Sequence, residues 1–365
     1  MWSVDGEALE RLAIGAGILG TGGGGNPYIG KVHAKQLLAA GHTLSVVSPD
    51  EVPDDALVTS VGFMGAPVVG VERIKRGDEP IVAMRALEKH IGRRFDYVVP
   101  GEIGGANSTT PMVVGALTGL PVIDGDGMGR AFPELQMDTF SIYGIPAAPG
   151  AIADPRGHVA LFDGFADATV LERYARSVTI GMGGSAGYAF PVMSGAELKR
   201  TVVVGTITLA IRVGEAVLAA RGSHRDPVDA VLGVTGGQRL FAGKIVDVER
   251  RLVGGFSRGV LKLDGTAGDA GRALTIDFQN ENLIARTDRG EILAVVPDLI
   301  CLVDADTAEP ITTEVLRYGL RVVVLGIPAP EALKTPEALV VVGPAAFGYE
   351  DVEFVPMAGR YGLGM

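Results

Sequence analysis

Residues 97–124 place the strongest constraint on the fold of this chain. A β-type run at Tyr97–Val99 is followed by a glycine-containing loop, a helical segment that ends near Thr118 and a second β-type run that ends at Asp124. A strand, a helix and a strand in this succession predict a right-handed crossover between two parallel neighbours. Because open α/β sheets bind ligands at the carboxyl ends of such strands, we expect Glu102 and Asp124 to lie near a site.

The flanking sequence extends this unit into an α/β half. Apolar residues recur at helical spacing over 7–19, a second helix is expected over 28–40, and the two segments enclose a glycine-rich run. Short β-type runs follow at 43–47 and 57–63, and Pro80 opens a further helix. We therefore expect an α/β N-terminal domain with a mixed, partly parallel sheet and covering helices.

The second half of the chain has a different pattern. Ser194 and Glu197 form a capping box, which predicts the start of a long helix that ends near Gly222. Beyond this helix, short β-rich runs alternate with Gly and Asp turns and predict a β-rich C-terminal domain. Since 365 residues exceed the size at which one core keeps growing, we expect two domains, 1–170 and 171–365.

Charge and composition exclude several classes of partner. The formal net charge is −11 and the sequence pI is near 5.0, whereas a nucleic-acid surface needs clustered Lys and Arg. The most apolar long segment, Thr201–Ala220, contains Arg212 and Glu215, which would be costly inside a membrane. The single cysteine, Cys301, cannot form an intrachain disulfide, and the amino terminus lacks a signal-peptide pattern. We expect a cytoplasmic protein without nucleic-acid or membrane partners, and the apolar β-rich half favours a homo-oligomer.

Three glycine motifs match familiar patterns but lack the surroundings that those patterns need. The run Gly20–Gly25 fits a dinucleotide fingerprint, yet it follows a helix instead of a strand. Gly25–Lys31 has the spacing of a phosphate loop, but Val32 replaces the Ser or Thr that holds Mg²⁺. Gly183–Gly187 has the form of a hydrolase nucleophile elbow, although no good helix start follows it. We interpret all three as loops whose backbone closely approaches a ligand or another segment.

The acidic residues near the two predicted strands form the most informative cluster. Glu102 lies in the run PGEIGGAN, and Asp124, Asp126 and Glu134 follow in one short stretch together with Arg130. Crowded carboxylates raise each other's pKa, which is one way to obtain a proton acceptor near neutral pH. The alternative is structural: Asp124 and Asp126 form Asx turns, and Glu134 caps a helix or faces solvent.

Two further patterns concern ligands. The segment Asp277–Leu283 holds five polar side chains in seven positions, which fits a turn and a binding edge equally well. The five histidines are scattered, without the spacing that marks a zinc site. A bound metal would therefore need oxygen ligands or residues that only the fold brings together.

Five stretches of the sequence, taken together, resemble one known family. They are LGTGGGGNPYIG at 19–30, GEIGGAN at 101–107, DGDGMGRAFPELQM at 124–137, FQNENL at 278–283 and PDLI at 297–300. In this order they are similar to the S-methyl thiohydantoin desulfurase-like family, whose members often occur beside hydantoinase and oxoprolinase proteins. The resemblance implies that water attacks the carbon bearing the S-methyl group of a cyclic isothiourea, so that methanethiol leaves and a hydantoin remains.

Such a hydrolysis needs a base for water, a group that polarises the ring and an acid for the leaving group. We expect Glu102 or Asp126 to be the base, and Asp124 to hold a metal or a ring N–H. A divalent metal such as Zn²⁺ is an open expectation, since no ligand set can be assigned from spacing. Asn107 and the backbone amides of Gly22, Gly23, Gly24 and Gly25 are expected to polarise a ring carbonyl, with Asn26 also binding substrate. Arg130 is expected to bind a substrate carboxylate, and Asn280 and Glu281 to close the site from the second domain.

Two other function classes stay open at this stage. The chain could be a non-catalytic partner subunit of a hydantoinase- or oxoprolinase-type enzyme, with its glycine loops serving assembly. That alternative predicts a stable complex with such an enzyme and no turnover by the isolated chain. If the chain were instead a nucleotide-binding, kinase-like protein, ATP would raise its melting temperature. We expect ATP to cause no such shift.

Overall fold

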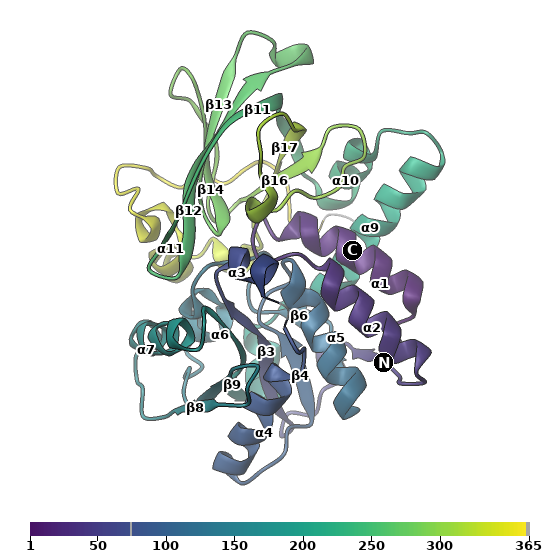
Figure 1. Ribbon diagram of the computed structural model, residues 1–365, viewed down its shortest axis with the longest axis vertical. Coiled ribbons are helices and arrows are strands. Elements are labelled where there is room, and N and C mark those ends of the chain that lie inside the picture. Colours follow the sequence, from purple (N-terminus) through teal and green to yellow (C-terminus); the bar gives the residue numbers. More distant parts are fainter. Residues whose placement is uncertain (74, 363–365) are drawn as a thin grey trace.

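The computed structural model describes residues 1–73 and 75–362 and contains two main sheets, one of them covered by helices (Figure 1). The helices are α1 (Gly6–Leu19), α2 (Tyr28–Ala39), α3 (Pro67–Glu72), α4 (Glu79–Ile91), α5 (Ala106–Thr118), α6 (Thr139–Ile142), α7 (Ala168–Gly181), α8 (Gly195–Thr201), α9 (Thr206–Gly222), α10 (Pro227–Thr235) and α11 (Pro336–Val342). The strands are β1 (Trp2–Ser3), β2 (Ser45–Val47), β3 (Leu57–Gly65), β4 (Tyr97–Pro100), β5 (Val122–Ile123), β6 (Gly125–Asp126), β7 (Gly150–Ala153), β8 (Val159–Phe162), β9 (Ser185–Ser194), β10 (Val203–Val204), β11 (Gln238–Val253), β12 (Phe256–Gly265), β13 (Ala273–Gln279), β14 (Glu281–Thr287), β15 (Ile292–Val295), β16 (Leu299–Asp304) and β17 (Arg321–Ile327).

The first sheet has eight strands in the order β1-β2-β5-β4-β3-β9-β7-β8. Its centre, β2-β5-β4-β3, is parallel, and the remaining pairs are antiparallel. The predicted crossover is confirmed, because β4 and β5 pair in parallel with α5 between them in the chain. The mixed, partly parallel sheet expected for the first half is confirmed as well.

The capping box in the middle of the chain is present, but it opens a different helix. The Ser194 hydroxyl accepts from the backbone N–H of Glu197, and the resulting helix, α8, has only seven residues. The long helix, α9, begins at Thr206, after the short strand β10. A residue outside the helix caps its first turn: the Asp124 carboxylate accepts a hydrogen bond from the backbone N–H of Thr208 at 3.0 Å. Such a cap satisfies a free N–H of the first helical turn, and the sequence gives no sign of its distant partner.

The second sheet has seven strands in the order β15-β14-β13-β12-β11-β17-β16, and all its pairs are antiparallel. This curled sheet confirms the β-rich second half. Strand β9 follows residue 170 in the chain and yet pairs with β3 and β7 of the first sheet. The domain boundary near residue 170 stays a prediction.

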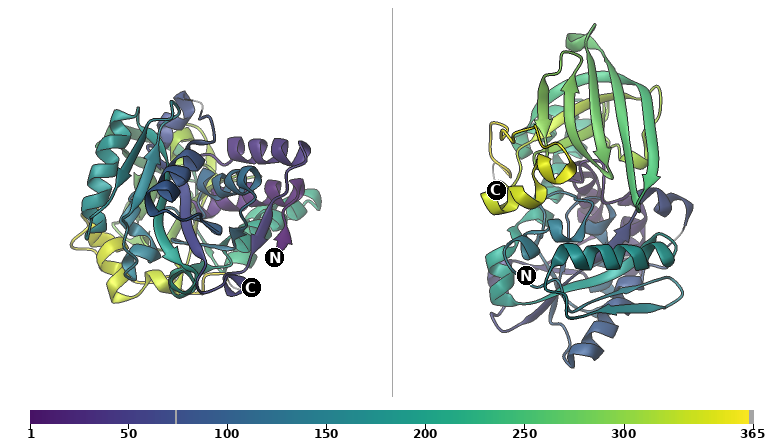
Figure 2. Two further views of the ribbon diagram at one scale, coloured as in Figure 1. Left: turned by 90° about the horizontal axis from the view of Figure 1, so that it is seen from below. Right: turned by 90° about the vertical axis from the view of Figure 1, so that its left-hand side faces the viewer.

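The two sheets share part of their core. One continuous cluster of buried side chains includes Leu12 of α1 and Val213 of α9 together with Leu299, Cys301 and Leu325 of the second sheet. The second sheet stands over the end of the helix-covered domain, and the C-terminal segment packs at one side of the junction (Figure 2). None of the helices in the described part of the chain is long and apolar enough to cross a membrane.

Candidate active site

A cavity of about 570 Å³ opens between the two domains. Its lining residues lie within 24–33, 63–77, 102–113, 128–135, 176–188, 280–281 and 314–315. The glycine loop after α1, the loop after β4 and the bend between β13 and β14 therefore meet around one space. A volume of this size suits a small organic molecule.

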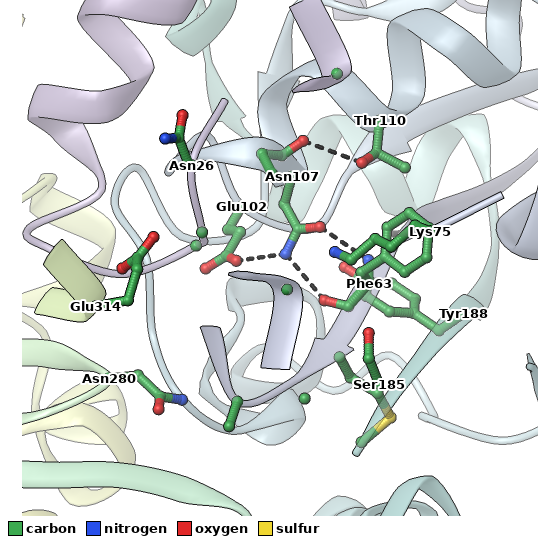
Figure 3. A pocket seen from close by; sticks show the side chains of 18 of the residues that line it. Asn26, Phe63, Lys75, Glu102, Asn107, Thr110, Ser185, Tyr188, Asn280 and Glu314 are labelled. Carbon is green, nitrogen blue, oxygen red and sulfur yellow. Dashed lines mark hydrogen bonds between the residues drawn. The ribbon is translucent and has the colours of Figure 1, made fainter. Parts of the chain in front are cut away.

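Glu102 projects into this cavity from the loop that follows β4 (Figure 3). The residue is only 6% exposed. Oε1 accepts from Nδ2 of Asn107 at 2.6 Å, and Oε2 accepts from the backbone N–H of Phe132 at 3.2 Å. Burial raises the pKa of Glu102 to about 8, against these two hydrogen bonds, which lower it. The carboxyl group is thus fixed in place, with a pKa well above that of an ordinary glutamate.

Asn107 holds Glu102 in position and has no amide proton left for a ligand. Its Oδ1 accepts from the backbone N–H of Phe63 at 2.8 Å, and its Nδ2 donates to the Phe63 carbonyl oxygen at 3.0 Å as well as to Glu102. Both amide protons are committed, since a side-chain amide has two. The expectation that Asn107 polarises a ring carbonyl is therefore corrected: it lines the cavity and orients the carboxyl group.

Glu281 and Asn280 enter the same cavity from the second domain. The side chain of Glu281 is 2% exposed, and no described residue donates a hydrogen bond to its Oε2. Burial raises the pKa of Glu281 well above its ordinary value, and the charge of Glu102 raises it further. Asn280 has φ 57°, and its Oδ1 accepts from the backbone N–H of Ser257 at 2.9 Å, which fixes the bend between β13 and β14.

The glycine loop forms one wall of the cavity, but its members differ in what they face. Gly24, Gly25 and Asn26 line the cavity, whereas Gly22 and Gly23 do not. A Cβ atom on Gly23 would stand 1.8 Å from Oε1 of Glu281, so only glycine lets this carboxyl group lie against the loop. The expected substrate contact of Gly22 and Gly23 is replaced by packing against the second domain.

We expect Gly23→Ala to lower kcat/KM by about 10²-fold, because the added methyl group must displace the Glu281 carboxyl group. Steady-state kinetics on the substrate proposed below measure the effect. Gly233→Ala in α10 is the matched control, since its Cβ would meet nothing within 4 Å. Wild-type kinetics for Gly23→Ala would contradict the packing of Glu281 against this loop.

Three residues expected at the site lie away from the cavity lining and have structural contacts instead. Asp124 caps α9, as described above. Asp126 is fully buried and accepts from the backbone N–H groups of Ile103 at 2.7 Å and Gly129 at 2.8 Å. These contacts fit the alternative that the two carboxylates hold turns and helix starts, and their catalytic role stays a prediction.

Arg130 is the third of these residues. Its guanidinium is fully buried and donates five hydrogen bonds of 2.9–3.4 Å, which use all five of its N–H groups. The acceptors are the carbonyl oxygens of Ala131, Pro297, Asp298 and Asn282 and the hydroxyl group of Thr21. No donor remains for a substrate carboxylate, so that expectation is also corrected: Arg130 ties the first domain to the second.

Comparisons with known proteins identify the family of this chain. Models of the S-Me-THD-like N-terminal and C-terminal domains match residues 7–164 and 166–357. The chain belongs to the S-Me-THD-like family. This match confirms the family suggested by the five sequence stretches.

A crystal structure of another protein shows the same fold. That protein comes from Chromobacterium violaceum, is 25% identical, and is matched over 98% of this chain and 100% of its own with a TM-score of 0.80. Its description names no activity. No curated protein matches the chain.

The cavity of this S-Me-THD-like protein also contains residues that the sequence did not single out. Lys75 lies with its Nζ 3.9 Å from the centre of the Phe63 ring. Burial lowers the pKa of Lys75 to about 8, against the charges of Glu79 and Glu314, which raise it. Glu314, in the short 3₁₀ turn Thr313–Val315, brings a further carboxyl group. Sequence spacing gives no signal for either residue, because both approach the cavity from segments remote from the family motifs.

The remaining motifs can be placed as well. Gly183–Gly187 follows helix α7 and leads into strand β9, the reverse of a nucleophile elbow, although Ser185 does line the cavity. Within residues 1–73 and 75–362, no group of three or more His, Cys, Asp or Glu side chains is arranged to hold a metal ion. A divalent metal therefore stays a prediction for which the described residues offer no fitting ligand set.

Proposed function

We propose that this chain hydrolyses the carbon–sulfur bond of an S-methyl thiohydantoin or a closely related heterocycle, with Glu102 as the general base. The observation that carries this proposal is the Glu102 carboxyl group: it is buried at the wall of the cavity between the domains, and two hydrogen bonds fix it there. Membership in the S-Me-THD-like family supports the substrate class.

The proposed reaction makes particular demands on such a group. The ring carbon bonded to sulfur is electrophilic, but neutral water attacks it slowly. A carboxylate within reach of that water removes its proton as the new C–O bond forms. Because the most effective base has a pKa near the working pH, a value of about 8 suits Glu102 to this task.

One part of the cavity lining fits a flat ring with an apolar substituent. Phe63, Phe132 and Tyr188 line it with aromatic rings, and Met128 adds an apolar side chain. Aromatic rings offer flat surfaces against which a planar heterocycle packs. At about 570 Å³, the cavity also leaves room for a side chain on the ring.

The rate should depend on pH through Glu102. A base acts in its ionised form, and burial raises the pKa of Glu102, so the active form accumulates only as the pH rises towards about 8. We expect kcat/KM to increase towards that pH with the slope of a single ionisation. A profile already flat from about pH 6, as for a carboxyl group with an ordinary pKa, would contradict this role.

A substrate panel tests the function directly. The purified protein is incubated with S-methyl thiohydantoins and with hydantoins, while thiol release and ring opening are both measured. We expect thiol from the S-methyl compounds and no opening of the hydantoins. No turnover of either class, together with a stable complex with a hydantoinase-type enzyme, would favour the partner-subunit alternative.

A further inference from the structure

One buried acid in the cavity is not used by the mechanism above. Glu281 is almost inaccessible, and its Oε2 has no partner among the described residues. Leaving a buried polar atom without a hydrogen bond is costly, so such an atom at the wall of a cavity indicates an interaction made only when a ligand is bound.

Three other charged groups around the cavity have described partners or are less deeply buried than Glu281. Arg176 forms an ion pair with Glu172 at 2.7 Å, and Glu134 accepts from the side chain of Gln136. Glu314 also has an oxygen without a described partner, but its side chain is partly exposed and faces Lys75. Glu281 is thus the most deeply buried carboxyl group with an unused oxygen at this site.

We propose that Glu281 is the general acid of the reaction and donates a proton to the departing sulfur, with Glu102 as the base in the same cavity. This inference rests on the proposed function and names the residue that completes it. Two geometric facts support it: both carboxyl groups line one cavity, and they come from different domains. The charged groups that face Glu281 are Glu102, whose charge favours its protonated form, and Arg130, whose charge opposes it.

The protons balance in this scheme. Glu102 takes a proton from water as the oxygen bonds to the ring carbon, and it passes this proton to the ring nitrogen that gains the electron pair of the C=N bond. In the second step, the new hydroxyl group gives its proton to Glu102 as the C=O bond forms. The C–S bond breaks with its electron pair on sulfur, and Glu281 protonates the thiolate to give methanethiol. Transfer of a proton from Glu102 to Glu281 then restores both groups.

The acidity of the leaving thiol provides the test. An S-methyl group leaves as a strongly basic thiolate and needs an acid, whereas an S-(4-nitrophenyl) group leaves as a weakly basic thiolate and does not. We expect Glu281→Gln to lower kcat by about 10²-fold or more on the S-methyl substrate and only slightly on the S-aryl substrate. Glu102→Gln should lose activity on both. Glu291→Gln, an exposed carboxylate in the second domain, is the control and should match the wild-type protein on both.

Each outcome decides the question. A wild-type rate for Glu281→Gln on the S-methyl substrate, or equal losses on both substrates, would overturn the role of Glu281. The wild-type protein gives a second readout that needs no variant: with a general acid in place, its kcat should vary little between the two leaving groups, and a steep increase for the S-aryl compound would overturn the inference. No thiol release by the wild-type protein from either substrate would instead overturn the proposed function, and this inference with it.

Discussion

Glu102→Gln is expected to abolish methanethiol release while the protein stays folded. The amide has nearly the same shape as the carboxyl group, and its oxygen still accepts from Asn107. It cannot take a proton from water, however, and the loss of a general base typically costs about 10²–10⁴ in rate. Thiol release under saturating substrate measures the effect. Retained turnover would remove Glu102 from the mechanism.

Thermal unfolding of the same variant provides its control. The folded-state pKa of Glu102 is raised to about 8, above the ordinary value of 4.5, so the folded protein binds a proton in this range that the unfolded chain has released. Wild-type stability from this group is complete below about pH 4.5 and is lost as the pH rises towards about 8. Glutamine does not titrate. The melting temperature of Glu102→Gln relative to wild type should therefore increase between about pH 5 and 8, and a constant difference would contradict the buried, protonated state.

Arg130→Met should destabilise the fold more than any of the other substitutions. Methionine keeps much of the apolar volume but removes all five hydrogen bonds, so that buried carbonyl oxygens in both domains lose their donor. Leaving such acceptors unpaired costs about 1–3 kcal/mol each before relaxation, and we expect a net loss of about 4 kcal/mol. Chemical denaturation measures this change in the free energy of unfolding.

Two further variants sharpen this second test. Arg130→Lys keeps the charge but has three donors on one atom, which cannot reach five separated acceptors, so we expect little recovery. Arg321→Met is the matched control, because that side chain is 65% exposed in a surface ion pair with Asp306. It should change stability by less than about 1 kcal/mol. Similar losses for Arg130→Met and Arg321→Met would contradict the role of Arg130 as a link between the domains.

Local patterns predicted most of the fold. The crossover at 97–124 was recognisable because a strand, a glycine loop and a helix each have their own short-range signal. The start of α9 could not be recognised from local sequence, because Asp124 caps that helix from a position far away in the chain. The return of β9 to the first sheet likewise depends on long-range pairing, which no local pattern encodes.

The candidate site could be predicted only in part, and for a similar reason. The sequence indicated a cluster of acidic residues near 102 and 124–134, but of these only Glu102 and Glu134 line the cavity. The hydrogen bonds of Asp126 to backbone N–H groups, and those of Arg130 to backbone carbonyl oxygens and the Thr21 hydroxyl group, depend on the tertiary fold. Lys75 approaches from a segment without any family motif, so its presence at the cavity depends entirely on the tertiary fold.

Isotope labelling tests the central claim of water attack on a substrate held in this cavity most directly. The protein is incubated in ¹⁸O-enriched water with an S-methyl thiohydantoin, and the masses of the products are measured by mass spectrometry. We predict methanethiol and hydantoin in equal amounts, with one ¹⁸O atom in the new ring carbonyl group, for the wild-type protein and not for Glu102→Gln. A ring-opened product without thiol, or equal labelling by both proteins, would contradict the account.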